Sequence, residues 1–123
     1  MTTVLLVDDS ATMLMSLKAI LSKAGYAVET AGHGKEALDK LGKGIKPQLI
    51  ISDVNMPQMD GITFAREARK VPGMRFVPIL MLTTESEQTK RDEAKKAGAT
   101  GWLVKPVAPA QLLGVIKQVL PGT

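Results

Sequence analysis

Short apolar runs alternate with segments of helical periodicity along the whole chain. The apolar runs have the length of buried strands, and the helical segments repeat their apolar residues at intervals of three and four. Glycine or proline follows most of the helical segments and marks where they end. The predicted strands are Val4–Val7, Tyr26–Ala31, Leu49–Ser52, Pro78–Leu82 and Trp102–Val104, and the predicted helices are Ala11–Ala24, Lys35–Leu41, Ile62–Val71, Glu87–Ala97 and Ala110–Leu120.

Strict alternation of strand and helix predicts a parallel sheet with helices on both faces. The strand runs are almost continuously apolar, as expected for parallel strands that are covered on both sides. We therefore expect an α/β fold, a doubly wound five-stranded parallel sheet with five helices. No linker, repeat or low-complexity tract divides the chain, so we expect one domain over residues 1–123 and no output domain.

Composition and charge narrow the class of protein. The apolar fraction of 45% suffices for one core, and the absence of cysteine removes disulfides, thiolate nucleophiles and sulfur-ligated metals. His33 is the only histidine, which argues against a histidine metal cluster or a Ser-His-Asp triad. The net charge of +4 comes with scattered lysines and few aromatic residues, so it does not indicate nucleic-acid binding. Without a membrane-spanning apolar stretch or a signal-peptide pattern, we expect a cytoplasmic protein with no membrane insertion.

Polar groups able to do chemistry follow four of the predicted strands. Because ligands bind outside the carboxyl ends of the strands in an open α/β sheet, these groups should meet at one edge. Crowded carboxylates repel unless a cation lies among them, and oxygen ligands alone indicate Mg²⁺. A carboxylate at the end of a buried strand can form an aspartyl phosphate, while a lysine and a metal neutralise the transferring group. The groups are Asp8, Asp9, Asp53, Thr83 and Lys105.

Taken singly, each of these residues has a simpler explanation. An aspartate after a strand is more often a turn former or a helix cap than a catalyst. Thr83 alone would be a strand-end hydroxyl, and Lys105 alone a solvated amine. The occurrence of such groups at four strand ends together favours a phosphoryl-transfer site.

These strand ends resemble the receiver domain of bacterial two-component response regulators. The resemblance covers essentially the whole chain and implies the strand order 2-1-3-4-5 of flavodoxin-like sheets. The matching motifs are Val7–Ser10, Asp53–Gly61, Leu82–Thr84, Gly98–Ala99 and Val104–Pro106.

The resemblance implies a role for each residue of the site. Asp53 would be the phosphoacceptor. Mg²⁺ would be bound directly by Asp9, Asp53 and the backbone carbonyl of Asn55, and Asp8 would reach the metal through water.

The resemblance also implies how the site would signal. Thr83 would move its hydroxyl toward the phosphoryl group, and Lys105 would pair with that group. Trp102 falls at the family's aromatic switch position, usually tyrosine or phenylalanine, and the Lys105–Pro106 bond is expected to be cis. The chain departs from the family pattern at Trp102, which is bulkier, and at Val107, where phenylalanine is common.

The implied function is that of a stand-alone response regulator, a signalling switch rather than an enzyme. A sensor histidine kinase or a histidine phosphotransfer protein would supply the phosphoryl group, and chemotaxis is one pathway that such a protein serves. Glu87–Ala97 has only Ala94 and Ala97 as apolar residues, so it should bury little and shift easily. We expect an output protein to bind around this helix, Trp102 and Leu113.

Two other functions stay open on the residues alone. A phosphatase of the haloacid dehalogenase type also uses a strand-end aspartate and Mg²⁺, but it has a second carboxylate where this chain has Asn55. A flavodoxin-like module has a hydroxyl- and glycine-rich loop after the first strand, where Asp8 and Asp9 would repel a phosphate unless a metal intervened. Turnover of a small phosphomonoester would favour the phosphatase, and a yellow colour would favour the flavodoxin.

Overall fold

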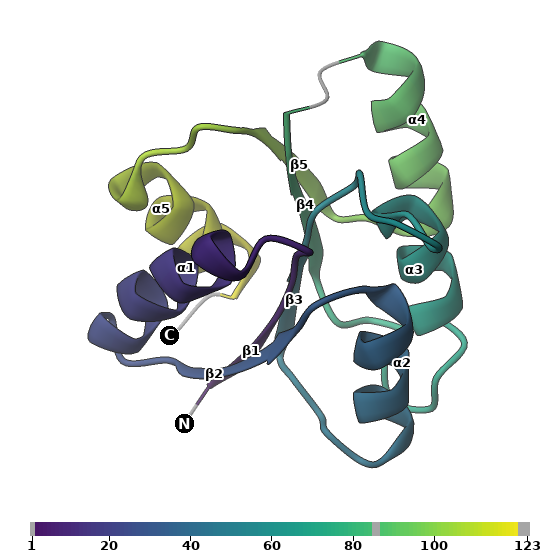
Figure 1. The fold of residues 1–123 in the computed structure, drawn as a ribbon, viewed down its shortest axis with the longest axis horizontal. Coiled ribbons are helices and arrows are strands. Elements are labelled where there is room, and N and C mark those ends of the chain that lie inside the picture. Colours follow the sequence, from purple (N-terminus) through teal and green to yellow (C-terminus); the bar gives the residue numbers. More distant parts are fainter. Residues whose placement is uncertain (1, 85–86, 121–123) are drawn as a thin grey trace.

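A computed structural model of the chain describes residues 2–84 and 87–120. Five parallel strands form one sheet in the order β2-β1-β3-β4-β5, and helices cover both of its faces (Figure 1). The predicted α/β class and strand order are confirmed. The strands are β1 (Thr3–Val7), β2 (Ala27–Ala31), β3 (Leu49–Ser52), β4 (Ile79–Thr83) and β5 (Gly101–Val104), and the helices are α1 (Ala11–Lys23), α2 (Gly34–Gly42), α3 (Gly61–Ala68), α4 (Gln88–Ala97) and α5 (Pro109–Val119).

A separate cluster of buried apolar side chains lies on each face of the sheet. In β1, Leu5 packs with residues of the α2, α3 and α4 layer, whereas Leu6 packs with residues of α1 and α5. Both side chains are almost completely buried. The two clusters fix the sheet from both faces, so the positions just beyond the strand ends are well defined. In the described part of the chain, no helix is long and apolar enough to cross a membrane.

Side chains cap three of the helices at their N-termini. The Ser10 hydroxyl accepts a hydrogen bond from the Met13 amide at 3.2 Å, and Asp60 accepts one from the Thr63 amide at 2.7 Å. The ring nitrogen Nδ1 of His33 caps α2 in the same way. These bonds satisfy amide groups that the first turn leaves without intrahelical partners. The lone histidine therefore has a structural role.

Helix α3 ends at Ala68, three residues before its predicted end at Val71. The amides of Lys70 and Val71 bond to carbonyls three residues back, which is a turn rather than a continued α-helix. The Arg69 guanidinium donates to the carbonyls of Met74, Val77 and Gly98 and so joins the α3–β4 loop to the residue after α4. The sequence pattern could not predict this contact, because Arg69 bonds to backbone carbonyls and not to particular side chains.

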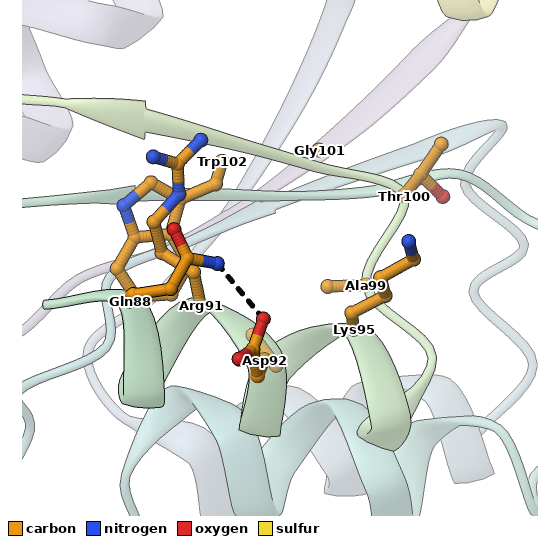
Figure 2. A pocket seen from close by; sticks show the side chains of 9 residues that line it. Gln88, Arg91, Asp92, Lys95, Ala99, Thr100, Gly101 and Trp102 are labelled. Carbon is orange, nitrogen blue, oxygen red and sulfur yellow. Dashed lines mark hydrogen bonds between the residues drawn. The ribbon is translucent and has the colours of Figure 1, made fainter. Parts of the chain in front are cut away.

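Helix α4 lies beside β5 and leaves a groove of about 350 Å³ between them (Figure 2). Only Ala94 and Ala97 of this helix are buried, which confirms that it buries little. Trp102 of β5 is half-buried against the α2–α4 core cluster and lines the groove. We call this the α4–β5 groove, lined among others by Gln88, Arg91, Asp92, Lys95, Thr100 and Trp102.

Candidate functional site

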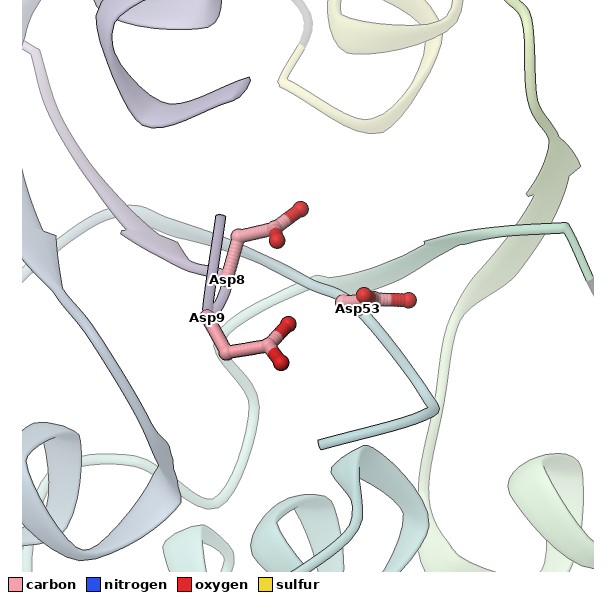
Figure 3. Close-up of side chains that lie close together, drawn as sticks. All are labelled: Asp8, Asp9 and Asp53. Carbon is pink, nitrogen blue, oxygen red and sulfur yellow. The ribbon is translucent and has the colours of Figure 1, made fainter. Parts of the chain in front are cut away.

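Three carboxylates meet at the carboxyl edge of the sheet (Figure 3). Asp8 and Asp9 follow β1, and Asp53 follows the neighbouring β3. Each of the three contributes an oxygen that lies within 4.8 Å of the other two. Asp8 is buried, whereas Asp9 is exposed. The predicted convergence of these residues is confirmed.

Among the described residues, Lys105 is the lysine that pairs with this acidic cluster. The Nζ atom of Lys105 lies 3.0 Å from Oδ2 of Asp8 and 3.6 Å from Oδ2 of Asp53. The Lys105 side chain is only 13% exposed, so solvent screens these charges weakly. One ammonium group can offset the charge of only one carboxylate, and the cluster has three. The remaining negative charge and the all-oxygen donor set suit a hard divalent cation such as Mg²⁺.

The pKa of the Asp53 carboxyl is raised above its ordinary value of 3.8. Burial is the largest cause, and the neighbouring Asp8 adds to it. Lys105 and the backbone amides of Val54 and Asn55 act in the opposite direction, and the Val54 amide donates to Oδ1 of Asp53 at 2.7 Å. The folded protein therefore stabilises the ionised carboxylate less well than water does. A cation bound beside Asp53 would favour the ionised form and lower its pKa.

We expect Asp53→Asn to be more stable than the parent protein at neutral pH without divalent cations. Because folding raises the pKa of Asp53, the stability that its proton contributes is complete below pH 3.8 and is lost as pH rises through the raised value. Lys105 keeps its partner Asp8 in the variant. Urea unfolding across this pH range should show the advantage of the variant shrinking on acidification. An advantage that grows as the pH falls would contradict the prediction.

Thr83 is the last residue of β4 and is completely buried. It pairs in register with Val104, and its carbonyl accepts a hydrogen bond from the Lys105 amide at 2.7 Å. Thr83 and Lys105 are thus fixed relative to each other through the backbone. The Lys105–Pro106 bond is cis, as predicted.

Gly61 ends the Asp53–Gly61 motif and has a structural role that the sequence alone does not reveal. Its amide donates to the Val54 carbonyl at 2.8 Å, which folds the loop after β3 back on itself. A Cβ atom at this position would lie 1.9 Å from the carbonyl oxygen of Asp53. Only glycine allows α3 to begin so close to the Asp53 backbone. Such an approach becomes visible only in three dimensions.

Two predicted residues lie apart from this cluster. Asn55 is exposed in the loop after Asp53, and a metal-binding role for its carbonyl stays a prediction. Leu113 is half-buried and packs on the core cluster beneath α1 and α5, whereas Trp102 packs on the opposite cluster. Leu113 does not line the α4–β5 groove. An output surface that includes both Trp102 and Leu113 therefore extends beyond this groove, and it stays a prediction.

Comparison with known proteins gives consistent matches along the chain. A family model described as the response regulator receiver domain matches residues 4–117. The chain is 39% identical over 120 residues to chemotaxis protein CheY1 of Helicobacter pylori, covering 97% of this chain and 96% of that protein. It is 48% identical to the structure of Vibrio cholerae chemotaxis protein CheY4, with a TM-score of 0.92 and coverage of 97% and 98%. The receiver domain of sensor histidine kinase PA1611 from Pseudomonas aeruginosa, solved with a magnesium ion in its active site cleft, matches at 28% identity, a TM-score of 0.88 and 97% coverage of both chains.

Proposed function

The chain belongs to the response regulator receiver domain family, and we propose that it is a stand-alone signalling switch controlled by phosphorylation of Asp53. Members of this family are signalling switches, so membership disfavours both the phosphatase, which is an enzyme, and the flavodoxin-like module, which belongs to another family. The observation that carries the proposal is the grouping of Asp53 with Asp8, Asp9 and Lys105 at one edge of the sheet. The phosphoryl donor would be a sensor histidine kinase or a histidine phosphotransfer protein.

The two oxygens of Asp53 have different surroundings. Oδ1 accepts the Val54 amide, whereas Oδ2 is the oxygen near Lys105. We assign Oδ2 as the oxygen that takes the phosphoryl group, because the adjacent ammonium group would neutralise part of the incoming negative charge. The position of Lys105 near both Asp8 and Asp53 supports a role in holding the product.

The donors around Asp53 fit Mg²⁺, and Asp9, Asp53 and the Asn55 carbonyl would hold it. Asp8 would act less directly, since its Oδ1 accepts the Ser10 amide at 2.9 Å and its Oδ2 pairs with Lys105. When bound, the metal would supply positive charge for the transferring phosphoryl group. The magnesium ion in the PA1611 receiver domain supports this assignment.

We expect Asp9→Ala to weaken Mg²⁺ binding by roughly tenfold or more, and at least as much as Asp8→Ala does. Asp9 is exposed and so is open to a direct ligand role, whereas Asp8 is already engaged. Calorimetric titration with Mg²⁺ measures the effect. Asp39→Ala is the control, because Asp39 is an exposed carboxylate on α2 that pairs only with Lys35 among the described ion pairs. Parent-like affinity in both site variants would refute the metal site.

Phosphorylation of Asp53 would change the conformation of Thr83 and then of Trp102. A phosphoryl group adds about two negative charges at neutral pH, and the Thr83 hydroxyl would donate to it. A shift of Thr83 would let Trp102 move inward and reshape the α4–β5 groove, since the two residues lie on adjacent strands. Favouring the active state takes a few kcal/mol, which one or two charge-assisted hydrogen bonds can supply. The output protein would bind at this groove rather than at Leu113, which packs on the other face of the sheet.

We expect the fluorescence of Trp102 to change when a phosphate mimic and Mg²⁺ are added. Trp102 is the only tryptophan, so the signal reports on this position alone. In Thr83→Ala the change should shrink to a small fraction while phosphorylation of Asp53 persists. An indole spectrum that ignores the mimic in the parent protein, or responds equally in the variant, would exclude this route.

Chemotaxis is the pathway we propose, because CheY1 and CheY4, two of the three relatives named above, are chemotaxis proteins. A cytoplasmic location belongs to the same proposal.

A further inference from the structure

Phe76 projects from the α3–β4 loop with 87% of its surface exposed. The loop around it is fixed, because Met74 is buried and Arg69 bonds to the carbonyls of Met74 and Val77. The Arg75 guanidinium lies 5.5 Å from the centroid of the Phe76 ring. An aromatic ring held outward beside an arginine has the composition of an interface hot spot.

Phe76 borders an open groove of about 540 Å³ at the edge of the sheet where the strands begin. This edge is opposite the one that carries Asp53, since β3 and β4 run from the groove toward the acidic cluster. The groove is therefore separate from the phosphorylation site and from the α4–β5 groove. We call it the Phe76 groove, lined among others by Pro47, Gln48, Arg75, Phe76, Val77 and Leu120.

The charged residue that lines the Phe76 groove is Arg75, which is positive. Residues 46–48 and 70–78 contain Lys46, Lys70 and Arg75 but no aspartate or glutamate. Lys70 pairs with Glu67, whereas Lys46 and Arg75 form no ion pair within the part of the chain that the structure describes. An apolar groove with a basic rim is complementary to an apolar side chain flanked by carboxylates.

We infer that the Phe76 groove is a docking site for a segment of another protein in which a large apolar residue is flanked by aspartate or glutamate. A second copy of the chain fits less well, because each copy carries a net charge of +4 and the copies repel. A lipid surface also fits less well, since the groove is concave and a single aromatic ring projects from its rim. The site would work without phosphorylation of Asp53.

The test uses a short synthetic peptide in which leucine and phenylalanine are separated by aspartate and glutamate. Titration of the full chain, followed by amide NMR shifts, should show changes clustered at the non-proline residues of 46–48 and 73–78. Two matched peptides separate the contributions: one has lysine at every acidic position, and the other has serine at every apolar position. Both should bind at least about tenfold more weakly.

Variants of the protein then assign the contact. Phe76→Ser should weaken binding of the acidic peptide roughly tenfold or more, and Arg75→Glu should reverse the preference toward the lysine peptide. Met15→Ser is the control, because Met15 is 73% exposed on α1 and lies outside the groove. All three changed side chains are exposed, so the variants should fold, and their phosphorylation should match that of the parent protein.

Several outcomes would overturn the inference. They are an absence of saturable binding, shifts centred on the acidic cluster or on α4, and equal binding of the serine peptide. Phe76-dependent sedimentation with phosphatidylglycerol vesicles, or Phe76-dependent self-association, in a protein that ignores the acidic peptide would also overturn it. Peptide binding at the Phe76 groove does not depend on phosphorylation of Asp53. The docking proposal and the phosphorylation proposal can therefore be refuted independently of each other.

Discussion

Asp53→Asn should reduce to background the acid-stable, base-labile phosphoryl group that the protein gains from a small phosphodonor and Mg²⁺. Asparagine keeps the shape of the side chain but lacks the anionic oxygen that attacks phosphorus. Its neighbours should persist, because Lys105 keeps Asp8 as a partner and the Val54 amide keeps an oxygen acceptor. Mass spectrometry of the intact protein measures the added group.

Asp60→Asn is the matched control for this experiment. Asp60 lies in the same motif, where it caps α3 by accepting the Thr63 amide, and asparagine caps helices about equally well. This variant should be labelled like the parent protein. Undiminished labelling of Asp53→Asn, or equal loss in both variants, would reject Asp53 as the acceptor.

Gly61→Ala should lower the free energy of unfolding by about 3 kcal/mol and depress phosphorylation as well. The new methyl group would lie 1.9 Å from the Asp53 carbonyl oxygen, so α3 or the end of β3 has to move. Either movement disturbs the backbone that carries the acceptor. Urea unfolding and phosphodonor labelling of the same variant report the two effects.

Gly114→Ala provides the opposite expectation for the same chemical change. Gly114 lies within α5, and a Cβ atom there would meet nothing within 4 Å. Alanine should therefore stabilise the protein by up to about 1 kcal/mol through its higher helix propensity. A Gly61→Ala protein as stable as the parent would contradict the close approach of α3 to Asp53.

The fold and most of the site were predictable because they depend on local patterns. The apolar runs define the strands, and the rule that ligands bind at the carboxyl ends of parallel strands brings Asp8, Asp53 and Lys105 together. The structure confirms this grouping and adds distances.

Features that depend on contacts between distant segments were not predictable. The end of α3 depends on Arg69, whose partners are carbonyl groups that any residue could supply. The side on which Leu113 packs depends on which core cluster α5 covers, and helical spacing alone does not specify this. Phe76 follows Arg75 in a loop, and its exposure results from anchors on either side rather than from its own neighbours in sequence.

The contact between Arg69 and the Gly98 carbonyl has a consequence for how α4 can move. Arg69 ties the C-terminal end of this helix to α3, and the two buried residues of α4, Ala94 and Ala97, lie toward that same end. The opposite end, which begins at Gln88, has no buried residue to hold it. We therefore expect any motion of α4 to be a pivot about Gly98, with the largest displacement at the first turn. That turn lies on the side of Thr83, so we expect a small shift at the strand end to be amplified along the groove rather than absorbed by the core.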